Sequence, residues 1–233
     1  MTSYQLQDFI PFSAEVYFRL LERISESGWP LHILSLALGA AALVLAFFVR
    51  KYEQRGRLAL LFIAPLWAWV AVVFFMQHYA QLNWAANYIA YAFLAQAILL
   101  LWLALTGAGF NTAAAAKTPA VIGLAIAVTG LVIQPLMTAL GGAGWWQAQV
   151  FGIHADPTAI TTLGLTLMLL RGWRLWLVTV IPMLWLTLSS LTLWVLEATE
   201  AWLLFAVLAA VLMKALLLSR LLSVIIRGRT KLS

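Results

Sequence analysis

Apolar residues fill most of this chain in long runs that short polar segments separate. A helix needs about 20 apolar residues to cross a bilayer core about 30 Å thick. Runs of this kind predict an all-α, polytopic membrane helix bundle with seven spans, of which the fifth has only about 14 residues. The predicted spans are residues 30–49, 58–78, 85–107, 118–140, 157–170, 174–196 and 200–222.

The basic residues are distributed as seven spans require. Connections that carry lysine or arginine alternate with connections that carry neither. Basic residues occur at 50–57, 117, 171–174 and 220–231, and none occurs at 79–84, 141–156 or 197–199. Because cytoplasmic loops carry an excess of positive charge, we expect the N-terminus outside and the C-terminus in the cytoplasm, with only Arg19 and Arg23 against the rule. A re-entrant fifth run would instead place Arg171 and Arg174 outside.

The N-terminal segment differs from the spans. Pro11 and Ser13 form a helix start signal, and Val16, Leu20 and Ile24 then recur at helical spacing with charged residues between them. This pattern predicts a short amphipathic helix on the outer surface or capping the bundle. The alternative is a solvated tail. The expected organisation is a single domain, with an interfacial segment at 1–29, a transmembrane bundle at 30–226 and a basic cytoplasmic tail at 227–233.

Composition narrows the class of protein. Hydrophobic residues make up 64% of the 233 residues, charged residues make up 9%, and the mean hydropathy is +0.97, which excludes a soluble domain. The net charge of +6 indicates loops that face an anionic membrane surface, and nucleic acid is not expected as a partner. We expect a multi-pass membrane protein, with the lipid bilayer and a homo-oligomer or other membrane proteins as partners.

Catalytic motifs are absent from the sequence. There is no cysteine, no His-Glu-x-x-His, no Gly-x-Ser-x-Gly and no pair of carboxylates at mid-span, so we do not expect an enzyme. Lys214 is the only basic residue well within a predicted span. Its side chain either snorkels to the cytoplasmic surface or has a functional role. A retinal pigment is excluded, because the third span offers no carboxylate as a counter-ion.

Residues 151–170, FGIHADPTAITTLGLTLMLL, stand out from the apolar runs. Asp156 followed by Pro157 predicts a helix start, with Asp156 as the N-cap and Pro157 as the first helical residue. A helix over 157–170 would be about 21 Å long, shorter than the bilayer core. Its N-terminus would then lie recessed below the outer surface, as helix ends do in transporter binding sites. Asp156 is therefore either a cap alone or a cap and a site.

The same helix carries a threonine face. Thr158, Thr161, Thr162 and Thr166 fall within a sector of about 140°. Such a face either bonds to neighbouring helices or forms a polar track beneath Asp156. On the second interpretation a ligand site comprises His154, Asp156, Thr158 and Thr162. Other polar residues with outer-half positions can complete a polar cavity or simply join helices; they are Gln134, Thr138, Ser189, Ser190 and Thr192.

All three histidines, His32, His78 and His154, map to the outer ends of spans. Imidazole and carboxylate together can bind a divalent metal, although the spacing matches no known metal motif. The alternative is that these histidines and carboxylates are simply hydrated side chains at the membrane–water interface. The candidate metal ligands are His154, Asp156, His78, Glu197 and Glu200, and no other cofactor is expected.

Two segments resemble a known family. They are IPFSAEVYFRLLERISESGWPLHI near the N-terminus and VFGIHADPTAITTLGLTLML before the fifth span. They resemble the bacterial integral-membrane proteins of domain-of-unknown-function family 6064. Asp156 stands where the family pattern has a cysteine, so no shared thiol chemistry is implied. The resemblance implies kinship along the whole chain, a location in a bacterial inner membrane and no particular activity.

These observations favour a carrier or channel for a small solute or an ion, such as a divalent metal. Its outward-facing site would lie at the start of the fifth span. The alternative is a non-catalytic accessory or scaffold subunit of a larger membrane complex, whose tryptophans and small residues pack against partner proteins.

Overall fold

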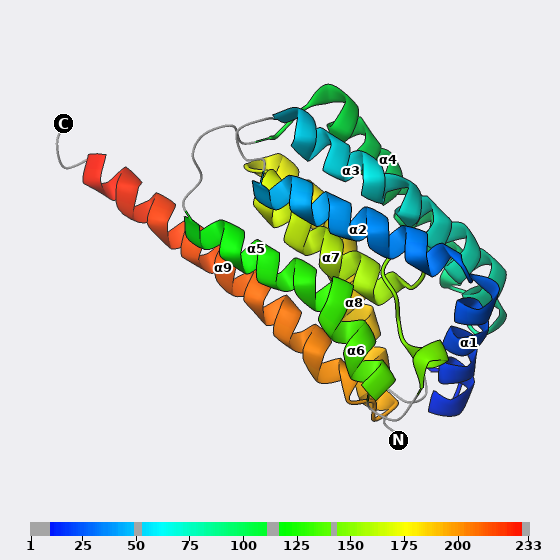
Figure 1. Cartoon of the computed structure of the whole chain (residues 1–233). Helices are drawn as coiled ribbons and strands as arrows, with labels where there is room; N and C mark the ends of the chain where they lie inside the picture. The colour runs from blue at the N-terminus through cyan, green and yellow to red at the C-terminus, as the bar shows by residue number, and fades with distance from the viewer. Residues whose placement is uncertain (1–9, 49–52, 111–116, 141–143, 230–233) are drawn as a thin grey trace, which may run out of the picture.

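The computed structural model describes residues 10–48, 53–110, 117–140 and 144–229, which form a bundle of helices (Figure 1). Among these described residues, β pairing is limited to two isolated bridges. The elements are α1 (Ala14–Ser27), α2 (Leu31–Phe48), α3 (Glu53–Trp69), η2 (Val70–His78), η3 (Tyr79–Gln81), α4 (Ala86–Thr106), α5 (Lys117–Val128), η4 (Thr129–Ile133), α6 (Gln134–Thr138), η6 (Trp145–Gln147), α7 (Ala155–Leu169), α8 (Trp173–Val195) and α9 (Glu200–Arg229).

A helix occurs at each position where the apolar runs predict a span, but the helices are not equally suited to cross a membrane. In the described residues four helical stretches have the length and apolar character to do so. They are Glu53–Gln81, Ala86–Thr106, Ala120–Thr138 and Trp173–Val195. A fifth is added if α1 and α2, which meet at an angle of 90°, count as one bent span. The all-α class is confirmed, whereas the count of seven spans and their orientation stay predictions.

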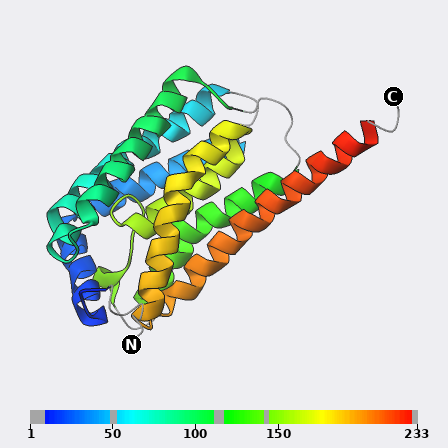
Figure 2. The ribbon, with the colours of Figure 1, turned by 180° about the vertical axis from the view of Figure 1, so that it is seen from behind.

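The short helix α7 lies at the centre of the bundle (Figures 1 and 2). It contacts α2, α3, α5 with η4, and α8, and every residue from Ala155 to Met168 is buried. A helix that is apolar around its whole circumference is stable only when other helices cover all of its sides. The threonines do not change this, because their small hydroxyl groups are compatible with helix–helix contacts.

Glycines allow α7 to touch its neighbour α5 backbone to backbone. A Cβ atom at Gly164 would lie 2.3 Å from the backbone nitrogen of Ala127 and 2.5 Å from the carbonyl oxygen of Gly123. A Cβ at Gly123 would in turn lie 2.7 Å from the carbonyl oxygen of Gly164. Neither position has room for a side chain, so small residues set the distance between the two helices.

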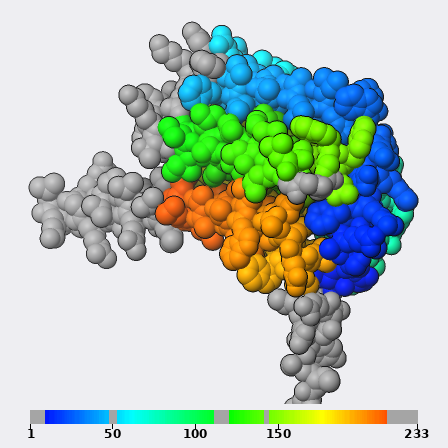
Figure 3. All heavy atoms as spheres, turned by 60° about the horizontal axis from the view of Figure 1, so that its bottom comes forward, coloured from blue at the N-terminus to red at the C-terminus, as the bar shows by residue number. Residues whose placement is uncertain are grey.

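Helix α1 closes one end of the bundle. Ser13 caps it as predicted, because the Ser13 side chain accepts from the backbone N–H of Val16 at 3.4 Å. Leu21 and Ile24 are fully buried, whereas Val16 is 42% exposed, so the apolar face is rotated from the predicted one. Figure 3 shows α1 in dark blue beside the orange segment around the start of α9. The packed face supports a capping helix over a solvated tail.

The basic connections gather at the end of the bundle opposite α1. Arg57, in the first turns of α3, donates to the carbonyl oxygens of Ala104 (2.6 Å) and Leu105 at the end of α4. The backbone N–H of Arg171 donates to the carbonyl oxygen of Gly109 at 3.0 Å. These contacts bring together three connections that the positive-inside rule assigns to one side. The basic tail at 227–233 lies partly outside the described residues.

Candidate functional site

Asp156 lies in the first turn of α7 with its carboxylate turned towards α8. It is 1% exposed. Its Oδ1 accepts from the indole N–H of Trp185 at 2.7 Å, and its Oδ2 accepts from the hydroxyl of Ser189 at 2.8 Å. Both donors are uncharged, so dipoles rather than a counter-ion compensate the carboxylate.

The prediction that Asp156 is the N-cap of this helix is wrong. Helix α7 begins at Ala155, and its N-cap is His154, whose side chain makes no capping bond. The donors on Trp185 and Ser189 draw the carboxylate sideways instead. Asp156 remains within the first turn, where the positive end of the helix dipole favours a negative charge.

His154 acts as a link between the loop before α7 and helix α1. Its Nδ1 accepts from the backbone N–H of Val150 at 3.0 Å, so the ring hydrogen lies on Nε2. Nε2 then donates to the carbonyl oxygen of Leu21 at 3.4 Å. Burial lowers the pKa of His154, which keeps the ring neutral. Both ring nitrogens are therefore engaged with the protein's own backbone.

The two threonines of the predicted site are engaged in the same way. Thr158 donates to the carbonyl oxygen of His154 at 2.6 Å and accepts from the backbone N–H of Gly152 at 2.8 Å. Thr162 accepts from the indole N–H of Trp67 at 2.8 Å. Both threonines are fully buried. These contacts are those expected of hydroxyl groups that join helices and loops.

The other candidate metal ligands are dispersed. His78 bonds through Nδ1 to the carbonyl oxygen of Val73 at 2.8 Å, Glu197 is exposed between α8 and α9, and Glu200 begins α9. In the part of the chain that the structure describes, no three His, Asp or Glu side chains are placed to hold one metal ion. The geometry thus gives the metal interpretation no support.

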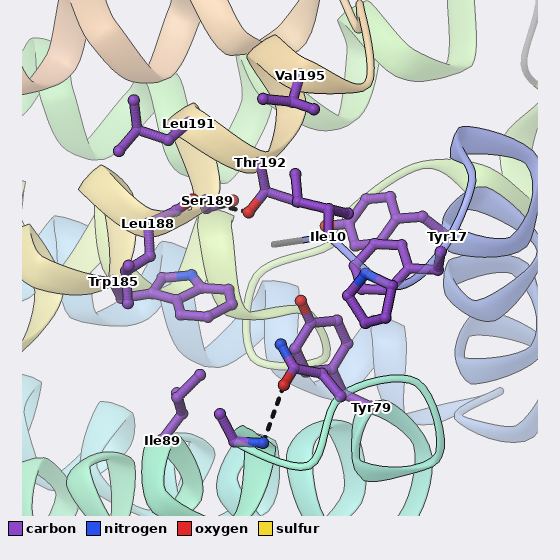
Figure 4. A pocket seen from close by; sticks show the side chains of 14 residues that line it. Ile10, Tyr17, Tyr79, Ile89, Trp185, Leu188, Ser189, Leu191, Thr192 and Val195 are labelled. Atoms are coloured by element: carbon purple, nitrogen blue, oxygen red, sulfur yellow. Dashed lines mark hydrogen bonds between the residues drawn. The ribbon is translucent and has the colours of Figure 1, made fainter. Parts of the chain in front are cut away.

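A cavity of about 280 Å³ opens beside Asp156, between α8, the η3 turn and the N-terminal segment (Figure 4). Trp185 and Ser189, the two donors to Asp156, form part of its wall. Of the polar residues predicted for an outer-half cavity, Ser189 and Thr192 line it. The complete lining is Ile10, Pro11, Phe12, Tyr17, Tyr79, Asn83, Ala85, Ile89, Trp185, Leu188, Ser189, Leu191, Thr192 and Val195.

The sequence did not single out Trp185, Tyr17 and Tyr79 as site residues. Trp185 and Ser189 are four residues apart, so they share one face of a helix, and this spacing was the available signal. Tyr17 and Tyr79 carried no such signal, because they reach the cavity only through the packing of α1 and η3 against the bundle.

Lys214 lies at the opposite end of α7. It is 6% exposed, and its Nζ donates to the carbonyl oxygen of Leu167 at 3.3 Å. The ammonium group therefore points inwards to the last turn of α7, where the helix dipole favours a positive charge. The interpretation that the Lys214 side chain snorkels to the cytoplasmic surface is therefore wrong.

The fold and the cavity together define a class of protein: a helical bundle with several helices suited to a membrane and a buried carboxylate beside a partly open cavity. The chain belongs to the family described as "Family of unknown function (DUF6064)", whose sequence pattern matches residues 14–224. The resemblance of the two segments is thereby confirmed. No curated protein and no solved structure matches the chain.

Proposed function

We propose that this protein is a carrier or channel for a small solute or ion in the bacterial inner membrane, and that the cavity beside Asp156 is its binding site. The observation that carries the proposal is a fully buried carboxylate compensated by two uncharged donors that form part of the wall of a cavity. A carrier needs a site that a solute can enter and leave, and a partly polar cavity at the end of a central helix has this form.

The cost of burying Asp156 supports the proposal. A carboxylate removed from water without a cation is expensive, even when hydrogen bonds surround it. Fold stability alone does not require such a group, because apolar residues of similar size can fill a helix interface at no such cost. A negative charge kept beside a cavity is instead useful for attracting a positively charged or proton-carrying solute.

Uptake by reconstituted vesicles tests this function. Vesicles with the native protein, Asp156→Asn or Lys214→Met would be incubated with a mixture of small cations, anions and neutral solutes, and their contents measured by mass spectrometry. We expect saturable uptake of at least one solute by the native protein and by Lys214→Met, and its loss in Asp156→Asn.

Absence of saturable uptake of every solute by folded native protein would overturn the carrier proposal. The accessory-subunit alternative would then lead, and it requires stable co-purification with another membrane protein.

A further inference from the structure

The wall of the cavity is rich in aromatic rings. Phe12 and Tyr17 come from the N-terminal segment, Tyr79 from η3 and Trp185 from α8. The rings of Phe12 and Tyr17 stack with centroids 6.0 Å apart, and Phe12 meets Tyr79 edge to face at 5.9 Å. Figure 4 shows Trp185 across the pocket from Tyr17 and Tyr79. Aromatic rings therefore form the cavity wall on more than one side.

The nearest charge assigned to the cavity lies behind its wall. The described residues that line it carry no charged side chain, basic or acidic. Asp156 lies directly behind Trp185 and Ser189, and Glu200 is within electrostatic range of both Asp156 and Tyr17. The cavity therefore favours a cation over an anion or a neutral solute of the same size.

The way in which Asp156 is buried restricts the kind of cation. Each carboxylate oxygen already accepts a hydrogen bond, and the residue is almost inaccessible. A metal ion needs several oxygen or nitrogen ligands in direct contact, which the described wall does not assemble. A methylated ammonium group needs no hydrogen-bond acceptor, because aromatic faces attract it electrostatically. The carboxylate then acts from behind the indole ring as a counter-charge.

Building on the proposed function, we propose that the solute is a compact organic cation with a methylated ammonium group, held by the rings of Phe12, Tyr17, Tyr79 and Trp185. The cavity volume of about 280 Å³ is close to the lower end of the range for small-molecule sites, roughly 300–1,000 Å³. A molecule of the size of choline fits this volume.

The test compares choline with 3,3-dimethylbutan-1-ol, in which carbon replaces the nitrogen and the charge is lost while the shape is kept. Both would be titrated into the full-length protein in lipid nanodiscs by isothermal calorimetry. We expect saturable choline binding that is at least about 10-fold tighter than binding of the neutral analogue, because only the charged group gains from the aromatic and carboxylate groups.

Variants at Tyr17 separate the ring from its hydroxyl. Tyr17→Leu should weaken choline binding by about 3- to 30-fold, and Tyr17→Phe, which keeps the ring, should weaken it less. Tyr88→Leu, on the exposed side of α4, is the matched control and should leave the affinity unchanged. Thermal unfolding of each variant in nanodiscs would verify that it is folded.

Equal affinities for the two probes, or no binding of choline, would overturn the proposed ligand class. So would an equal loss of affinity in Tyr17→Phe and Tyr17→Leu. Saturable uptake of a different solute in the vesicle experiment would leave the carrier function standing, so failure of this inference and failure of the proposed function are distinguishable.

Discussion

Each end of α7 is next to a buried charged side chain that complements the helix dipole, but the surroundings of the two charges differ. At the N-terminal end Asp156 places a negative charge at the positive pole of the helix, and at the C-terminal end Lys214 places a positive charge at the negative pole. The donors to Asp156 form part of the wall of a cavity, whereas neither Lys214 nor Leu167 lines that cavity. Burial of a charge therefore does not by itself indicate a binding site; the adjoining space does.

Gly164→Val should have the largest effect, because it disturbs both ends together. The added side chain would overlap the backbone of α5 at Ala127 and Gly123, which cannot move aside as a side chain can. We expect a loss of about 3 kcal/mol or more in the free energy of unfolding, at or beyond the usual cost of overpacking. Chemical unfolding in mild detergent measures this change. The control Leu184→Val, on the exposed face of α8, should change stability by less than about 0.5 kcal/mol.

Asp156→Asn should affect the N-terminal end alone. The amide has only one oxygen, which Trp185 needs, so the Ser189 hydroxyl must turn and accept from the new N–H group, and two charge-assisted hydrogen bonds become weaker neutral ones. We expect a loss of about 1–3 kcal/mol in unfolding free energy and at least about 10-fold weaker choline binding. Calorimetry and chemical unfolding measure the two effects. Glu197→Gln removes an exposed charge and should alter neither; an equal effect at Glu197 would point to long-range charge rather than to the cavity.

Lys214→Met should affect the C-terminal end alone. The substitution removes the hydrogen bond to Leu167 and also the cost of burying an ammonium group, and these effects partly cancel. We expect a change of about 1 kcal/mol in unfolding free energy, and solute uptake should stay at the native level. Loss of uptake in folded Lys214→Met would mean that the solute pathway includes this end, and the contrast between the two ends would fail.

The bond between Trp67 and Thr162 should give the smallest effect. It joins α3 to the middle of α7, away from both ends. A double-mutant cycle with Trp67→Phe and Thr162→Val should give a coupling energy of about 0.5–1.5 kcal/mol. Choline binding by the double variant should equal that of the native protein. A large loss of binding would show that the threonine face belongs to the site after all.

The helices of this bundle could be predicted from the sequence, because long apolar runs have few other stable arrangements in a bilayer. The shortness of the fifth run also marked α7 as unusual. Its central position could not be read from the same pattern, since several spans are equally apolar and their packing order depends on contacts between distant residues. Here the close approach of Gly164 to Gly123 decides which helix lies beside α7.

The site was predicted in part. Asp156 was identified from the polar cluster before α7, but its role as a cap was inferred from its neighbours in sequence, whereas its actual partners are Trp185 and Ser189 on α8. His154 illustrates the same limitation. Its ring was one candidate ligand for a bound solute or metal, and it bonds to backbone groups of Val150 and Leu21, one of which lies 133 residues away.

A cationic solute in the cavity, with Asp156 behind the wall as its counter-charge, would change the surroundings of this carboxylate, and infrared difference spectroscopy tests this most directly. Spectra of protein with ¹³C-labelled aspartate would be recorded with and without choline, and Asp156→Asn would assign the Asp156 carboxylate band. The account predicts that choline shifts this band and that the shift is absent in the variant. Saturable choline binding with an unchanged Asp156 band would contradict the account and place the ligand elsewhere in the molecule.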